Sequence, residues 1–158
     1  MLPEDRADNA IAIGFRSHDQ VQTARMQIVN VANGWARARD QLEAEYIPSL
    51  QCNENLHLVI VIDFDEQFVT RREDFDARVP AQLKNRVFVI GARKTPEVLK
   101  KAIKSSFGNL SFEEIGKKLA EDCYKRTSTI WSHSELQHNA PDLRRLFDVV
   151  RDILFEES

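Results

Sequence analysis

Short apolar runs alternate along the chain with longer segments in which apolar residues recur every three or four positions. The most apolar run is residues 56–62, interrupted only by His57, and residues 86–90 form a second run. Near-continuous apolar character is typical of strands that are covered on both faces of a parallel sheet. Residues 26–32 are a third candidate strand, and residues 1–3 have the pattern of the end of a first strand. The pattern therefore predicts four strands.

Helical spacing or a helix-start signal marks the segments between and after these strands. Thr95 before Pro96 predicts a capping residue followed by proline at the first helical position. Ser111 and Glu114 have the spacing of a capping box. We expect helices at residues 5–18, 35–50, 68–79, 96–104, 112–124 and 141–154.

The order of these elements favours one architecture. Helices that alternate with strands indicate a parallel sheet with right-handed crossovers. We expect an α/β core at residues 1–104 with about four parallel strands flanked by helices, and a helical C-terminal extension at residues 105–158 that packs on this core. A length of 158 residues fits a single domain.

Composition and charge narrow the class of protein. With 42% hydrophobic and 30% charged residues, the chain has a globular balance. The net charge of −3 argues against a protein that coats nucleic acid. Residues 84–126 nevertheless hold eleven Lys and Arg against five Asp and Glu. This local excess fits either a basic face beside a phosphodiester site or a set of solvated helix faces.

The N-terminal residues and the two cysteines indicate the cellular compartment that we expect. Cys52 and Cys123 match no metal-ligand spacing and predict no disulfide framework. The start of the chain lacks the pattern of a secretory signal, and no apolar run is long enough to span a bilayer. We expect a cytoplasmic protein that does not associate with a membrane.

Acidic residues follow the most apolar run directly. Asp63 and Asp65 come after residues 56–62, and Glu4 follows the candidate first strand. Because sites in open parallel sheets form outside the carboxyl ends of the strands, we expect the three carboxylates to converge there. Hard cations such as Mg²⁺ bind carboxylates, and three uncompensated carboxylates would repel one another. The alternative is that Asp65 caps the next helix and Asp63 accepts hydrogen bonds from loop amides.

These residues resemble the pattern of the Toprim domain, which occurs in topoisomerases, bacterial primases, recombination proteins and overcoming-lysogenization-defect nucleases. The resemblance depends on Glu4 and on Ile62-Asp63-Phe64-Asp65, and it covers roughly residues 1–92. It implies a Rossmann-like Toprim fold and Mg²⁺- or Mn²⁺-dependent making or breaking of phosphodiester bonds. It also implies the glutamate as acid or base and the aspartates as metal ligands. The segments at residues 86–91, 112–116, 131–133 and 136–139 are similar to those of small bacterial Toprim-like proteins.

Two other families also place acidic residues after buried strands. Haloacid-dehalogenase phosphatases use Asp-x-Asp on their first strand with Thr or Val two residues further on, where this chain has Gln67. Response-regulator receivers use a single aspartate after the third strand, and Lys94 stands where their later lysine would be expected. The second aspartate and the long helical tail argue against a receiver.

The function expected from the sequence is a metal-dependent nuclease that acts on nucleic acid. The alternative is a non-catalytic Toprim-like subunit that binds a partner protein or a nucleotide. Arg93 and Lys94 follow the strand at residues 86–90 and either contact a phosphate or are surface residues. His133 and His138 either act in proton transfer, metal binding or phosphate contact, or pack the tail on the sheet.

Overall fold

A parallel sheet forms the centre of the computed structural model, which describes residues 1–155. The strands are β1 (Leu2–Pro3), β2 (Leu58–Val61) and β3 (Val87–Ile90), in the order β1-β2-β3. Leu2 lies opposite Ile60, so β1 pairs with the second half of β2. Both neighbours of the central strand run parallel to it, as the alternation of elements predicted.

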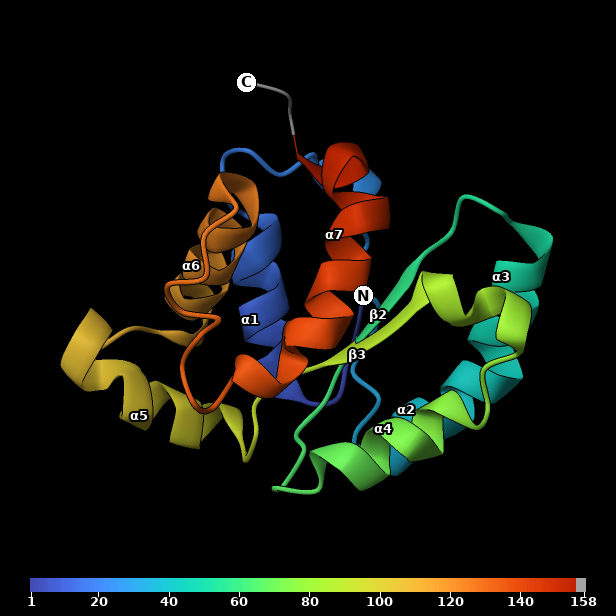
Figure 1. Ribbon diagram of the computed structural model, residues 1–158, viewed down its shortest axis with the longest axis horizontal. Coiled ribbons are helices and arrows are strands. Elements are labelled where there is room, and N and C mark those ends of the chain that lie inside the picture. Colours follow the sequence, from blue (N-terminus) through green and yellow to red (C-terminus); the bar gives the residue numbers. More distant parts are fainter. Residues whose placement is uncertain (156–158) are drawn as a thin grey trace.

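Seven α-helices surround this sheet within residues 1–155, and their positions agree closely with the sequence pattern (Figure 1). The helix α5 continues to Phe107, three residues beyond its predicted end. A π-helical turn at Leu42–Tyr46 joins α2 to α3, so the predicted single helix continues with one irregular turn. The helices are α1 (Arg6–Arg16), α2 (Trp35–Gln41), α3 (Ile47–Cys52), α4 (Phe68–Asp76), α5 (Pro96–Phe107), α6 (Phe112–Lys125) and α7 (Ala140–Leu154).

The strand predicted at residues 26–32 is wrong: this segment is irregular in the structure. It does run beside β1, because the Val29 N–H donates to the Met1 carbonyl at 3.0 Å and the Ala32 N–H donates to the Pro3 carbonyl at 2.9 Å. Between these two bonds the segment advances three residues and the β1 side advances two, so the pairing is not a regular ladder. The sheet therefore has three strands where the sequence predicted four.

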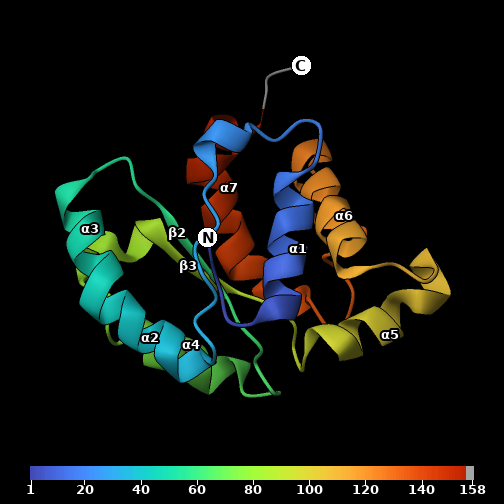
Figure 2. The same ribbon diagram turned by 180° about the vertical axis from the view of Figure 1, so that it is seen from behind.

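Each face of the sheet is covered by its own group of helices (Figures 1 and 2). The side chains of β2 alternate between the two faces, as the pleat of a strand requires. Val61 joins the core formed with α1, α5, α6 and α7, whereas Ile60 joins the core formed with α2, α3 and α4. This burial on both sides explains the near-continuous apolar pattern of β2.

The C-terminal helices belong to the same core as α1. The helix α6 lies against α1 so closely that a Cβ on Gly14 would be 2.0 Å from the Glu113 carbonyl oxygen. A Cβ on Gly116 would likewise be 2.0 Å from the Ile11 carbonyl oxygen. Glycine is thus required on both helices, and this contact fixes the position of α1 relative to α6.

No helix within residues 1–155 combines the length and the apolar character that a membrane span needs.

Candidate metal centre

Glu4 continues the edge of the sheet immediately after β1. Its N–H donates to the Val61 carbonyl at 2.8 Å, and its own carbonyl accepts from the Asn33 N–H at 2.8 Å. The Glu4 carboxylate accepts a hydrogen bond from the Asp63 N–H at 2.8 Å. Backbone bonds on both sides therefore fix Glu4, and its carboxylate is aimed at the residue that follows the central strand.

Asp8 reaches the same place from the first turn of α1. Asp5 caps this helix, because its carboxylate accepts from the N–H groups of Ala7 at 2.8 Å and of Asp8 at 3.0 Å. The Asp8 side chain is then turned inward and is only 1% exposed. Its Oδ2 atom has no hydrogen-bond partner among residues 1–155.

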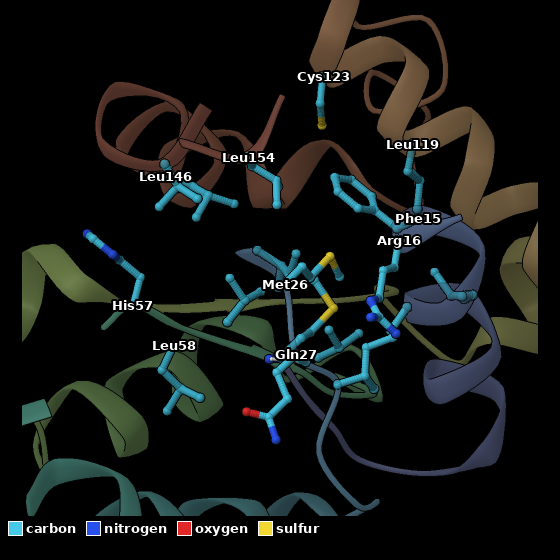
Figure 3. A pocket seen from close by; sticks show the side chains of 18 of the residues that line it. Phe15, Arg16, Met26, Gln27, His57, Leu58, Leu119, Cys123, Leu146 and Leu154 are labelled. Carbon is cyan, nitrogen blue, oxygen red and sulfur yellow. Dashed lines mark hydrogen bonds between the residues drawn. The ribbon is translucent and has the colours of Figure 1, made fainter. Parts of the chain in front are cut away.

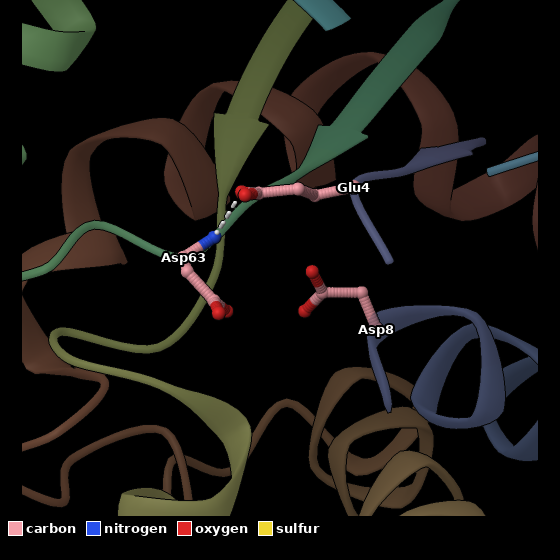
Figure 4. A group of neighbouring side chains, drawn as sticks. All are labelled: Glu4, Asp8 and Asp63. Atoms are coloured by element: carbon pink, nitrogen blue, oxygen red, sulfur yellow. Dashed lines mark hydrogen bonds between the residues drawn. The ribbon is translucent and has the colours of Figure 1, made fainter. Parts of the chain in front are cut away.

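The carboxylates of Glu4, Asp8 and Asp63 form one cluster at the carboxyl edge of the sheet (Figure 4). One oxygen atom of each lies within 4.8 Å of the others. The Oδ1 atom of Asp63 is also buried without a hydrogen-bond partner among the described residues. The sequence thus identified Glu4 and Asp63 but missed Asp8. A signal for Asp8 exists, since it adjoins Ala7 on the helical face that also carries Ile11.

The electrostatics of this cluster favour protons or a cation. Burial, followed by repulsion from Glu4, raises the pKa of Asp63 to about 8. Burial and repulsion from Asp63 raise the pKa of Asp8 well above its ordinary value, and burial raises that of Glu4. A divalent cation would relieve the repulsion and give partners to both unpaired oxygens. Because all the donors are carboxylate oxygens, the set fits Mg²⁺ or Mn²⁺.

Asp65 lies outside this cluster. Its backbone has a φ of +45°, and its half-exposed carboxylate accepts a hydrogen bond from Arg71 at 2.7 Å. Nor does Asp65 cap α4, since Gln67 stands at that cap without a side-chain hydrogen bond. The ligand role expected for Asp65 stays a prediction, and the structure gives it a different neighbour.

Arg93 and Lys94 lie beside the turn that follows β2. The carbonyls of both accept backbone hydrogen bonds from this turn, from Glu66 at 2.7 Å and from Asp65 at 3.2 Å respectively. The Lys94 ammonium is 3.3 Å from the Glu66 carboxylate. The two residues thus hold the turn through their main chain, and a phosphate contact by their side chains stays a prediction.

His138 packs the C-terminal segment against the same turn. Its ring stacks on Phe68 and meets the edge of Phe64, each at 5.0 Å between ring centroids. Its Nδ1 accepts from Arg72 at 3.1 Å. Burial, followed by the charge of Arg72, lowers the pKa of His138 to about 4, so the ring is neutral at physiological pH. His133 accepts a local hydrogen bond from the Glu135 N–H at 3.2 Å.

A large cavity of about 760 Å³ lies behind the cluster, on the side of the sheet that faces α1 and α7. Its walls are mainly apolar side chains, such as those of Phe15, Met26 and Leu154 (Figure 3). Asp8 also lines it, so the cavity extends to the acidic cluster. Beyond Asp8, its walls do not gather a second group of carboxylates that could bind a metal among residues 1–155.

Comparison of the chain with protein-family models, with curated proteins and with solved structures gives no significant match.

Proposed function

We propose that the chain binds Mg²⁺ or Mn²⁺ through Glu4, Asp8 and Asp63 and uses the ion to cleave phosphodiester bonds in nucleic acid. The observation that carries this proposal is the convergence of three carboxylates within 4.8 Å, two of them with a buried oxygen that lacks a hydrogen-bond partner within residues 1–155. Surface carboxylates are often near one another without binding an ion, but Asp8 is almost fully buried.

The position of the cluster supports phosphodiester chemistry. Glu4 follows β1 and Asp63 follows the neighbouring β2, so both lie at the carboxyl edge of the sheet. Of the three residues on which the Toprim resemblance depends, Glu4 and Asp63 belong to the cluster and Asp65 does not. Mg²⁺ bound by few carboxylates keeps several waters and bridges to substrate phosphates. Such an ion polarises the phosphate and lowers the pKa of a bound water.

The residues of the chain have distinct tasks in this proposal. Asp8 and Asp63 would supply the negative charge that holds the ion. The Asp63 N–H donates to Glu4 and so fixes the orientation of the Glu4 carboxylate. The Glu4 carboxylate, which also interacts with the Trp35 N–H, would bind the ion or accept a proton from water.

Calorimetric titration of Mn²⁺ and Mg²⁺ into the chain tests the site. We expect binding to the wild type, a loss of at least about tenfold in affinity for Asp8→Asn and Asp63→Asn, and no change for Asp148→Asn on the exposed side of α7. Cleavage assays on single-stranded DNA, duplex DNA and RNA then test the activity. A wild type that binds neither ion would refute the site.

The burial of Asp8 also favours a second candidate, a non-catalytic subunit in which the ion stabilises a surface for a partner protein. An ion held by a side chain that is only 1% exposed has less access to a substrate. This candidate predicts that Mn²⁺ raises the melting temperature while all three nucleic-acid substrates stay intact.

A further inference from the structure

Arg71 places a buried guanidinium beside the acidic cluster without a hydrogen bond to any of its three carboxylates. The residue is only 6% exposed. One of its N–H groups donates to the main-chain carbonyl of Asp63, and another donates to the Asp65 carboxylate at 2.7 Å. The charge of Arg71 is thus paired with Asp65, while its other contact holds the backbone of a proposed metal ligand.

The turn held by Arg71 has an unfavourable backbone. Asp65 and Glu66 have φ angles of +45° and +65°, a left-handed region that residues other than glycine seldom occupy. Such conformations persist only where surrounding contacts determine them. Here the N–H groups of both residues donate to the segment after β3, and Arg71 secures the turn from the opposite side.

The Arg71 guanidinium lies over the ring of Trp35. The central carbon of the Arg71 guanidinium lies 4.8 Å from the centroid of the Trp35 ring, a cation–π distance. Trp35 is the first residue of α2, whereas Arg71 belongs to α4. The residue before it, Gly34, donates its N–H to the Glu4 carbonyl at 3.4 Å. Trp35 and Arg71 therefore connect the backbone at Glu4 with the backbone at Asp63.

We infer that Arg71, oriented by Trp35 and Asp65, is a positioning residue that holds the Asp63 turn so that the Asp63 carboxylate faces Glu4 and Asp8. In this arrangement Asp65 acts as the counter-ion of Arg71 and not as a ligand of the metal. The inference rests on the proposed metal site. It assigns a task to Asp65 that differs from the ligand role expected from the sequence.

Two measurements on matched variants test this inference. The first is Mn²⁺ affinity by calorimetry, and the second is hydrogen exchange of the Asp63 amide in metal-free protein, which reports the bond from that amide to Glu4. The variants are Arg71→Met, Asp65→Asn, their double variant and Arg71→Lys, which keeps the charge. The control is Arg78→Met, which removes a partly exposed arginine close to α4 that pairs with Glu43 at 3.4 Å.

We expect Arg71→Met to weaken Mn²⁺ binding about tenfold or more and to accelerate exchange of the Asp63 amide by a similar factor. Asp65→Asn should act in the same direction, and the double variant should be no worse than Arg71→Met, because both changes break one linked unit. Arg71→Lys should recover part of the loss. The control should change neither quantity.

Three results would overturn the inference. One is a loss of Mn²⁺ affinity for Asp65→Asn with normal affinity for Arg71→Met, which would make Asp65 a ligand. Another is a lowered melting temperature for Arg71→Met with unchanged Mn²⁺ affinity and unchanged Asp63 exchange. The third applies if Arg71→Met does not fold. The inference is then overturned if Arg71→Lys and Asp65→Asn both keep the Mn²⁺ affinity and the Asp63 amide exchange of the wild type. If the wild type binds no Mn²⁺, the proposed function fails, and the amide exchange still decides the role of Arg71.

Discussion

Asp63 is a carboxyl group that the metal-free fold holds in its protonated form. Burial and the neighbouring carboxylates raise its pKa to about 8, so ionisation in the folded chain requires free energy that the unfolded chain does not need. The native state thus binds a proton more tightly at Asp63 than the unfolded state does. The contribution of Asp63 to stability is present at low pH and is lost as the pH rises from about 4 to about 8.

Asp63→Asn should remove this pH dependence in metal-free protein. We expect the free energy of unfolding of the variant, relative to the wild type, to increase as the pH rises from 5 to 8. The shifted groups at His138 and at the Met1 amine are present in both proteins, so the difference reports Asp63 together with Asp8, whose pKa Asp63 helps to raise. Urea denaturation with a chelator at several pH values measures it. A difference that is constant with pH would contradict the raised pKa of Asp63.

The sequence could predict two of the three cluster residues. Glu4 and Asp63 follow neighbouring parallel strands, and the carboxyl ends of such strands meet at one edge. Asp8 requires knowledge of how α1 is rotated, which depends on its contact with α6. Asp65 was expected beside Asp63, but its positive φ turns the side chain to Arg71, and no residue type in the turn predicted that conformation.

Among the elements, the contact between α1 and α6 has little tolerance for change. The two glycines let the backbones touch, with 2.0 Å between each added Cβ position and a carbonyl oxygen of the other helix. Backbone atoms cannot move aside as a flexible side chain can. Any side chain at these positions must push the helices apart.

We therefore predict that Gly14→Ala and Gly116→Ala each lower the free energy of unfolding by about 1–3 kcal/mol, the usual cost of overpacking. This loss should occur although alanine favours helices more than glycine does. Denaturant unfolding measures this loss of stability. The control is Ser105→Ala at an exposed position of α5, and we expect its free energy of unfolding to be within about 0.5 kcal/mol of the wild type. Wild-type stability of both glycine variants would show that the helices have room between them.

The position of α1 also connects this contact to the cluster, since Asp8 lies on that helix. We predict that Gly14→Ala weakens Mn²⁺ binding more than an equally destabilising change far from α1 does. Leu83→Ala supplies that comparison, because Leu83 is the buried residue of the turn before β3. Calorimetry on both variants measures the Mn²⁺ affinity. Equal affinities would show that the contact between α1 and α6 does not affect the metal site.

Element boundaries were predictable where a local signal exists. Thr95 with Pro96 and Ser111 with Glu114 begin α5 and α6 as expected, and both caps form their hydrogen bonds. Residues 26–32 have the apolar pattern of a strand, but a ladder also needs matched spacing on both chains. The segment advances three residues between its two bonds to the β1 side, which advances two, and the apolar pattern of the segment does not show this mismatch.

For the molecule as a whole, a bound ion should couple the N-terminal segment to the central strand. Glu4 and Asp8 come from the start of the chain, whereas Asp63 follows β2. A ligand that binds only the native state adds stability by mass action, about 2.7 kcal/mol at one hundred times its dissociation constant.

We predict that saturating Mn²⁺ raises the melting temperature of the wild type by about 5–10 °C relative to protein with chelator, which follows from that free energy for a chain of this size. Asp8→Asn should show little of this increase. Calorimetric melting with and without the ion measures it. An equal increase in both proteins would indicate binding elsewhere.

The α/β class with a parallel sheet was predictable from the alternation of elements alone, because strands buried on both faces and intervening helices allow few other arrangements. Which helices cover which face was not predictable in the same way. It depends on side-chain alternation in β2 and on the two glycines, and both become apparent only when distant segments are brought together.

The contact between Gly14 and Glu113 joins residues that are far apart along the chain, and so does the pairing of Leu2 with Ile60. Contacts of such long range slow folding, because large loops must close before they form. The acidic cluster needs both of them, so it can exist only after the N-terminal segment has docked. Mn²⁺ binding followed during refolding would then report that docking step, and it should not begin before the contacts of Gly14 with Glu113 and of Leu2 with Ile60 have formed.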